Sequence, residues 1–176
     1  MREAAPAFAE DPALALEQAF RRIETERMRD VPILNPALAV RALGFRRGSE
    51  GWLGVLLTPW CMNLMLLPAE GTAWRSLPPG DKRSVAFPGG EFEFIAGHEA
   101  AIGEFHSCSL FSPVFEFSDQ DAACETARAA LEALFTAEPA GPSGEAQPAI
   151  IEGLQPRQAM SKRDFLRGEF LRPRAP

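Results

Sequence analysis

An almost unbroken apolar stretch, residues 52–67, limits what this chain can fold into. Gly and Pro interrupt it, and it is shorter than the roughly 20 apolar residues that a helix needs to cross a bilayer. It is also too apolar for the alternating pattern of a half-exposed strand. We therefore predict two largely buried strands, residues 51–57 and 60–67, bent at Thr58-Pro59 in the centre of a sheet.

Further strands are expected on either side of this centre. Residues 84–87 and 92–95 have the β-branched and aromatic content of strands around a Pro-Gly-Gly turn. Residues 102–110 can supply another strand. Residues 35–45 fit either a short helix or a strand, because prolines interrupt the pattern before them.

Two helices enclose these strands in the sequence. Asp11-Pro12 has the residue types of a helix start, and apolar residues then recur at helical spacing to about Arg29. Ser118-Asp119 provides capping side chains for a second helix over residues 122–135. This order predicts one α+β domain, mainly an antiparallel sheet, with both helices covering one face.

The domain is expected to span residues 12–136. Residues 1–11 are predicted to be a flexible N-terminus without the apolar core of a secretory signal. Residues 137–176 are dominated by Pro, Gly, Ser, Gln and Glu and are predicted to form a disordered or loosely attached tail. The three cysteines have no C-x-x-C spacing, which suits a reducing compartment. A cytoplasmic protein without a membrane span is therefore expected.

Charge and motif content argue against several function classes. The net charge is −6, which disfavours a nucleic-acid partner. Nucleotide-binding glycine motifs and nucleophile elbows are missing, so neither enzymatic activity nor a cofactor is predicted. His106 and Cys108 would share one face of a strand, which leaves open a small metal-delivery or redox protein. No further ligand pair is evident, and no metal site is predicted.

Aromatic and thioether side chains gather in two Pro-containing segments. Such side chains adapt to apolar surfaces of partner proteins, although each can equally belong to the core. The predicted partner-binding residues are Trp60, Met62, Met65, Phe111, Phe115 and Phe117.

The same two segments resemble those of a known family. Residues 58–68, TPWCMNLMLLP, resemble the TPWFMNLxLLP segment of HybE/HupJ proteins. Residues 108–117, CSLFSPVFEF, are similar to their CSLFSPMFEF segment. Cys61 stands where Phe is common in the family, which weakens any argument for an essential thiol there. The resemblance spans roughly residues 31–135.

The resemblance implies a cytoplasmic chaperone for [NiFe]-hydrogenase assembly. Its expected partners are the precursor large and small subunits, or either one, before export by the twin-arginine pathway, together with other maturation proteins. Besides metal delivery or redox work, a structural subunit of a hydrogenase maturation complex is the remaining alternative.

The tail contains a separate motif. Residues 161–167, SKRDFLR, resemble the S/T-R-R-x-F-L-K motif of twin-arginine signals, with Lys in place of the first Arg, but the long apolar region of a signal does not follow. The alternatives are a mimic of a client signal and a short basic tail. In the first case the recognition residues are Lys162, Arg163, Phe165, Leu166 and Arg167.

Overall fold

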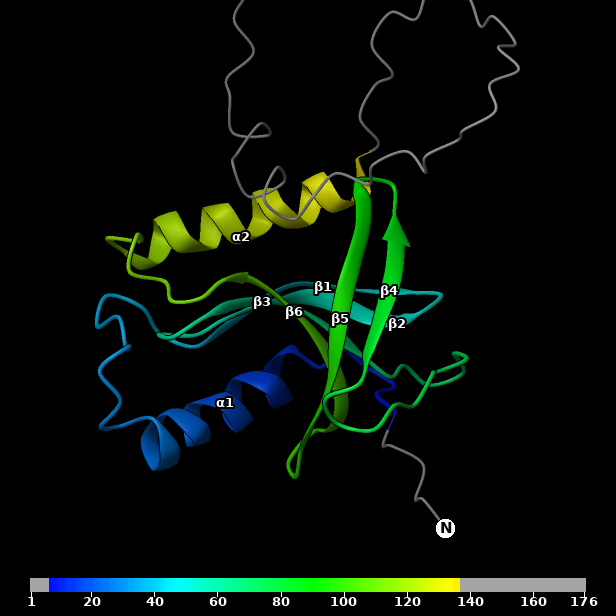
Figure 1. Ribbon diagram of the computed structural model, residues 1–176, viewed down its shortest axis with the longest axis horizontal. Helices are drawn as coiled ribbons and strands as arrows, with labels where there is room; N and C mark the ends of the chain where they lie inside the picture. Colours follow the sequence, from blue (N-terminus) through cyan, green and yellow to red (C-terminus); the bar gives the residue numbers. More distant parts are fainter. Residues whose placement is uncertain (1–6, 137–176) are drawn as a thin grey trace, which may run out of the picture.

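The computed structural model describes residues 7–136 (Figure 1). Within this range the elements are α1 (Ala13–Arg27), β1 (Arg41–Gly48), β2 (Gly51–Leu57), β3 (Met62–Leu67), β4 (Lys82–Phe87), β5 (Gly90–Glu99), β6 (Gly103–Phe111) and α2 (Gln120–Phe135). The predicted α+β class, with one helix before and one after an antiparallel sheet, is confirmed. Neither helix in the described range is long and apolar enough to cross a membrane.

The six strands of the described range form one antiparallel sheet in the order β1-β2-β3-β6-β5-β4. The predicted central strands are β2 and β3, which pair from Trp52 opposite Leu67 to Leu57 opposite Met62. Strand β3 begins later than expected because the preceding residues form the turn. Strand β6 pairs with β3 and joins the two halves of the sheet.

The helices cover opposite faces of the sheet, so the expectation that both cover one face is wrong. Figure 1 shows the central strands between α2 on one side and α1 on the other. Leu131 of α2 belongs to one buried cluster with Leu64 and Leu66, whereas Leu16 of α1 belongs to a second cluster with Met65. Strands β2 and β3 are apolar on both faces, so each face must be covered.

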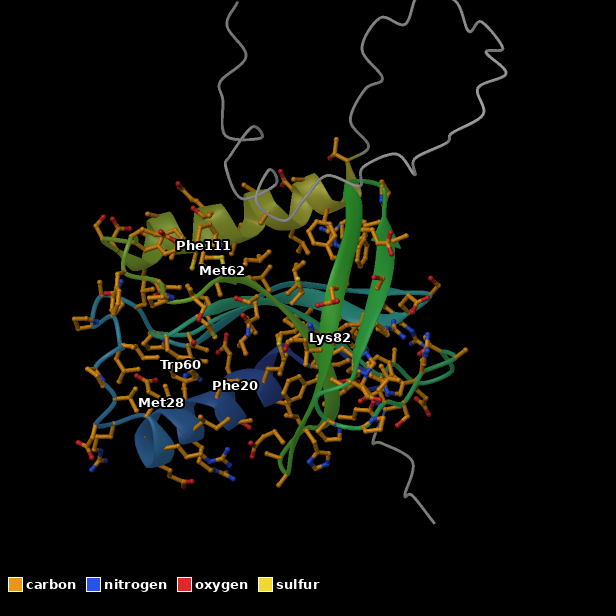
Figure 2. The ribbon with its side chains drawn as sticks, in the orientation of Figure 1. Phe20, Met28, Trp60, Met62, Lys82 and Phe111 are labelled. Carbon is orange, nitrogen blue, oxygen red and sulfur yellow. The ribbon has the colours of Figure 1, made fainter. Side chains whose placement is uncertain are left out.

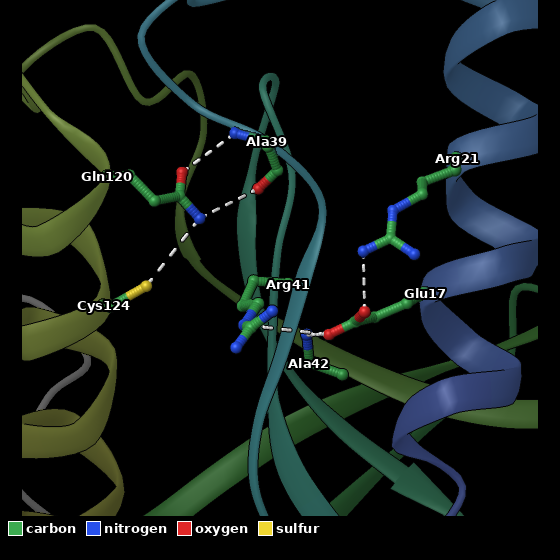
Figure 3. Close-up of polar contacts among 7 residues, drawn as sticks. All are labelled: Glu17, Arg21, Ala39, Arg41, Ala42, Gln120 and Cys124. Atoms are coloured by element: carbon green, nitrogen blue, oxygen red, sulfur yellow. Dashed lines mark hydrogen bonds and ion pairs between the residues drawn. The ribbon is translucent and has the colours of Figure 1, made fainter.

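Side chains from both helices fix the chain where it enters edge strand β1 (Figure 3). The amide group of Gln120 on α2 accepts from the Ala39 N–H at 2.9 Å and donates to the Ala39 carbonyl at 3.2 Å. Glu17 on α1 accepts from the Ala42 N–H at 3.0 Å. These bonds occupy backbone groups that an edge strand otherwise offers to another chain.

Phe8, in the segment expected to be flexible, pairs with the sheet region. Its N–H donates to the Pro68 carbonyl at 2.9 Å, and its carbonyl accepts from Glu70 N–H at 3.1 Å and from the Trp52 indole at 3.0 Å. The expected tail, residues 137–176, lies outside the described residues.

Candidate functional site

Asn35 connects three loops at one end of the sheet. Its backbone N–H donates to the Pro59 carbonyl at 2.7 Å. Its side-chain Nδ2 donates to the carbonyls of Val114 at 3.0 Å and Phe117 at 2.8 Å, while its Oδ1 accepts from the Ala37 N–H at 3.0 Å. Asn35 is buried. One residue therefore holds three backbone segments in a fixed arrangement: its side chain bonds residues 112–119 and its own loop, and its backbone N–H bonds the loop at Pro59.

We call these loops, residues 31–38, 58–61 and 112–119, the loop junction. Figure 1 shows the first and last of them beside the C-terminal end of α1 and the N-terminal end of α2. The loops of both segments that resemble the HybE/HupJ family are thus brought together, although about 50 residues separate them in the sequence.

Thr58 shapes the turn that carries Trp60. The fully buried Thr58 Oγ1 accepts from the N–H groups of Trp60 at 3.3 Å and Cys61 at 3.0 Å, and donates to the Cys61 carbonyl at 3.1 Å. Burial raises the pKa of the Cys61 thiol above its ordinary value, despite a hydrogen bond from Thr58 that lowers it. Cys61 is therefore a neutral, buried thiol that serves as a small apolar side chain.

Three of the six predicted partner-binding residues are buried. Met62 lies in the cluster that faces α2, and Met65 lies in the cluster that faces α1. Phe117 is also buried and packs edge-on against Phe111, with 5.2 Å between the ring centroids. In Figure 2, Met62 and Phe111 lie on the α2 side of the sheet and Trp60 lies on the α1 side. The six side chains therefore do not form one continuous surface.

The other three candidates reach the surface of the loop junction. Phe115 is 58% exposed, and Trp60 and Phe111 are partly exposed. Ile33 on the neighbouring loop is 39% exposed. It was not predicted, because Pro32 and Pro36 interrupt this segment and leave no helical or strand periodicity. Exposed apolar residues on loops held by buried hydrogen bonds are a feature of protein-binding sites.

Carboxylates accompany these apolar residues. Residues 111–125 contain four acidic residues and neither Lys nor Arg; all four are exposed: Glu116, Asp119, Asp121 and Glu125. Asp119 also caps α2 by accepting from the Ala122 N–H at 2.8 Å. We call Ile33, Phe111 and Phe115, together with these four carboxylates, the junction surface. Its chemistry suits a ligand that is both apolar and cationic.

His106 lies in a separate buried polar cluster on β6. Its Nε2 is 3.1 Å from Glu104 Oε1, and its ring stacks on Trp74 with 4.4 Å between centroids. Burial lowers the pKa of His106 below its ordinary value. Burial alone would raise the pKa of Glu104, but hydrogen bonds from Ser76, Leu77 and His106 outweigh it and lower that pKa. The pair is thus a neutral imidazole beside an ionised carboxylate at neutral pH.

Within the described residues, the surroundings of His106 and Cys108 add no group of metal ligands that would support the metal-delivery or redox alternative. Cys108 is buried in the α2-facing core, and His106 is engaged with Glu104. Among residues 7–136, groups of three or more His, Cys, Asp and Glu side chains that could hold a metal ion are not found.

Known proteins resemble this chain over most of its length. The sequence model of the family described as "[NiFe]-hydrogenase assembly, chaperone, HybE" matches residues 11–168. The hydrogenase expression/formation protein HupJ of Bradyrhizobium diazoefficiens is 39% identical over 153 residues, which are 87% of this chain and 85% of that protein. The probable rubredoxin HupJ of Rhodobacter capsulatus is 44% identical over 124 residues, but this chain covers only 45% of its length.

One solved structure shares the fold. The solution structure of HybE from Escherichia coli superposes with a TM-score of 0.64 at 21% sequence identity, covering 89% of this chain and 98% of that one. The family match also includes the twin-arginine-like motif at residues 161–167, although these residues and their five candidate recognition side chains lie outside the described range.

Proposed function

The chain belongs to the HybE family of [NiFe]-hydrogenase assembly chaperones, and we propose that it binds precursor subunits of a [NiFe]-hydrogenase in the cytoplasm before their twin-arginine export. The observation that carries this proposal is the loop junction, where Asn35 joins both family-like segments and leaves Phe115 exposed beside carboxylates. The proposed action is binding rather than catalysis.

Phe115 is the proposed central contact. Its neighbours Val114 and Phe117 are buried and bonded through their carbonyls to Asn35, so the loop backbone is already ordered before a client binds. A pre-ordered loop loses little conformational entropy on binding. Burying an exposed Phe side chain contributes about 1.5 to 3 kcal/mol. The surrounding carboxylates would attract a cationic client segment and set its orientation.

Affinity capture from cells that are maturing a [NiFe]-hydrogenase tests this function. A tagged copy of the full chain should recover a large or small subunit that still carries its unprocessed end, identified by mass spectrometry. An unrelated acidic protein with the same tag serves as the control. Recovery of no hydrogenase subunit contradicts the proposal, and recovery of mature enzyme alone points to the structural-subunit alternative.

A further inference from the structure

We propose that residues 161–171 of this same chain occupy the junction surface and compete there with any client. The segment lies outside the described residues, and its sequence is SKRDFLRGEFL. The proposal goes beyond client binding, because it concerns the protein in the absence of any hydrogenase subunit.

Charge complementarity favours this occupant. Residues 157–174 contain six Lys and Arg residues against two carboxylates, at Asp164 and Glu169. The junction stretch, residues 111–125, has the opposite character, with four exposed carboxylates and neither Lys nor Arg. Charge-assisted hydrogen bonds between guanidinium and carboxylate groups are stronger than neutral ones and orient the bound segment.

The segment and the junction surface both carry large apolar side chains. The segment repeats a Phe-Leu pair, at residues 165–166 and again at residues 170–171. The junction surface exposes Phe115 at 58% and Ile33 at 39%. Contact between these groups would remove apolar surface from water on both partners.

Residues 137–160, which connect α2 to the segment, are long enough for the segment to reach the junction surface. Helix α2 has 16 residues, so the described chain ends about 24 Å from the start of α2 at the loop junction. Residues 137–160 add 24 residues before the segment begins, and a chain of that length can span up to about 80 Å. Tethering also gives the segment an effective concentration on the order of 1 mM. If the segment binds the junction surface with an intrinsic Kd of about 100 µM, it would lower the apparent affinity of a competing ligand about tenfold.

A hollow nearer to the end of α2 is a poorer match. It encloses about 170 Å³ beside Phe135 and is flanked by Arg46 and Arg47. Its acidic residue, Glu50, is already paired with Arg83. A cationic segment would meet two arginines there without a free carboxylate, whereas the junction surface offers several.

Photo-crosslinking in the full chain locates the segment directly. Phe165 is replaced by p-benzoylphenylalanine, the protein is irradiated at micromolar concentration, and crosslinked peptides from the monomeric fraction are mapped by mass spectrometry. We expect crosslinks to residues 112–119. Crosslinks to the hollow beside Phe135, crosslinks only between two copies, or the absence of intramolecular crosslinks would each overturn the proposal.

Peptide competition measures the effect. A fluorescent peptide of residues 161–171 should bind the full-length Phe165→Ala/Leu166→Ala variant about tenfold more tightly than it binds the unchanged chain. Gln155→Ala/Gln158→Ala, in the same tail but outside the segment, should leave its affinity unchanged. Adding Phe115→Ala to the Phe165→Ala/Leu166→Ala variant should weaken peptide binding again. Adding Leu14→Ala, which alters a 65% exposed leucine on α1, should not.

If the peptide bound the unchanged chain and the Phe165→Ala/Leu166→Ala variant with equal affinity, residues 161–171 would not occupy the junction surface. No hydrogenase subunit takes part in either experiment, so their failure leaves the precursor-capture test intact. Conversely, failed precursor capture leaves the crosslinking and peptide results interpretable.

Discussion

Asn35 has a structural importance that its small polar side chain conceals. Its side chain donates to the carbonyls of Val114 and Phe117, which lie in one loop about 80 residues away in the sequence. The sequence left residues 35–45 open between a short helix and a strand and did not reveal these bonds, because nothing local indicates which distant carbonyls an amide side chain will meet.

Asn35→Ala should therefore destabilise the fold. Two buried carbonyls each lose the hydrogen bond from the Asn35 amide, and the free energy of unfolding should fall by about 2 to 3 kcal/mol. Urea denaturation followed by circular dichroism measures the change. Ser118→Ala, at an exposed hydroxyl of the same junction, should change stability by less than about 0.5 kcal/mol. A loss below about 1 kcal/mol in Asn35→Ala would mean that loops 31–38 and 112–119 are held together by other contacts.

His106 should make stability depend on pH. The folded-state pKa of His106 lies below its ordinary value of 6.5. Between these two pKa values, His106 is protonated in the unfolded chain but neutral in the folded chain. Stability is fully present above pH 6.5 and is lost as the pH falls toward the folded-state pKa, with a slope of up to about 1.4 kcal/mol per pH unit. The lowered pKa of Glu104 extends this loss below pH 4.5.

His106→Gln should reduce the difference in unfolding free energy between pH 7 and pH 5.5, whereas His98→Gln, at the exposed histidine, should preserve it. An NMR titration of the unchanged protein provides a measurement that requires no variant. Protonation of His106 near pH 6.5 or above would show that the proposed linkage has the wrong sign.

At the level of elements, apolar continuity and capping residues predicted β2, β3 and α2 well. Asp119 caps α2 as expected, since its side chain accepts from the Ala122 N–H. The arrangement of the helices was missed, because a strand that is apolar on both faces does not reveal which helix covers which face. Met62 and Met65 show the same limit, since strand geometry places them on opposite faces and both are buried.

Gly89 controls how the β4–β5 turn meets α2. Its N–H donates to the Leu134 carbonyl at 2.9 Å, and an added Cβ would lie 2.3 Å from the Ala133 carbonyl oxygen. Gly89→Ala should thus force the turn and the end of α2 apart and cost about 2 kcal/mol or more. Gly48→Ala is the matched control, because the nearest atom to its added Cβ is 3.9 Å away. Equal melting temperatures for Gly89→Ala and the unchanged protein would exclude this close packing.

On the scale of the whole molecule, helix α2 separates the junction surface from the point where residues 137–176 begin. The junction surface lies at the start of α2, and residues 137–176 follow from its other end. The two family-like segments were recognisable from sequence alone, but their meeting at Asn35 depends on the pairing of β3 with β6, which no local pattern encodes.

The most direct test of the account is the affinity of a purified hydrogenase precursor subunit for three forms of the full chain, measured by calorimetry. Loss of a central aromatic contact costs about 2 kcal/mol, so Phe115→Ala should weaken binding about 30-fold. Leu14→Ala, at a position on α1 that is 65% exposed against 58% for Phe115, should bind as the unchanged chain does. Thermal unfolding should be the same in all three, because both side chains are exposed. Unchanged affinity in a correctly folded Phe115→Ala variant would contradict the assignment of client binding to the loop junction.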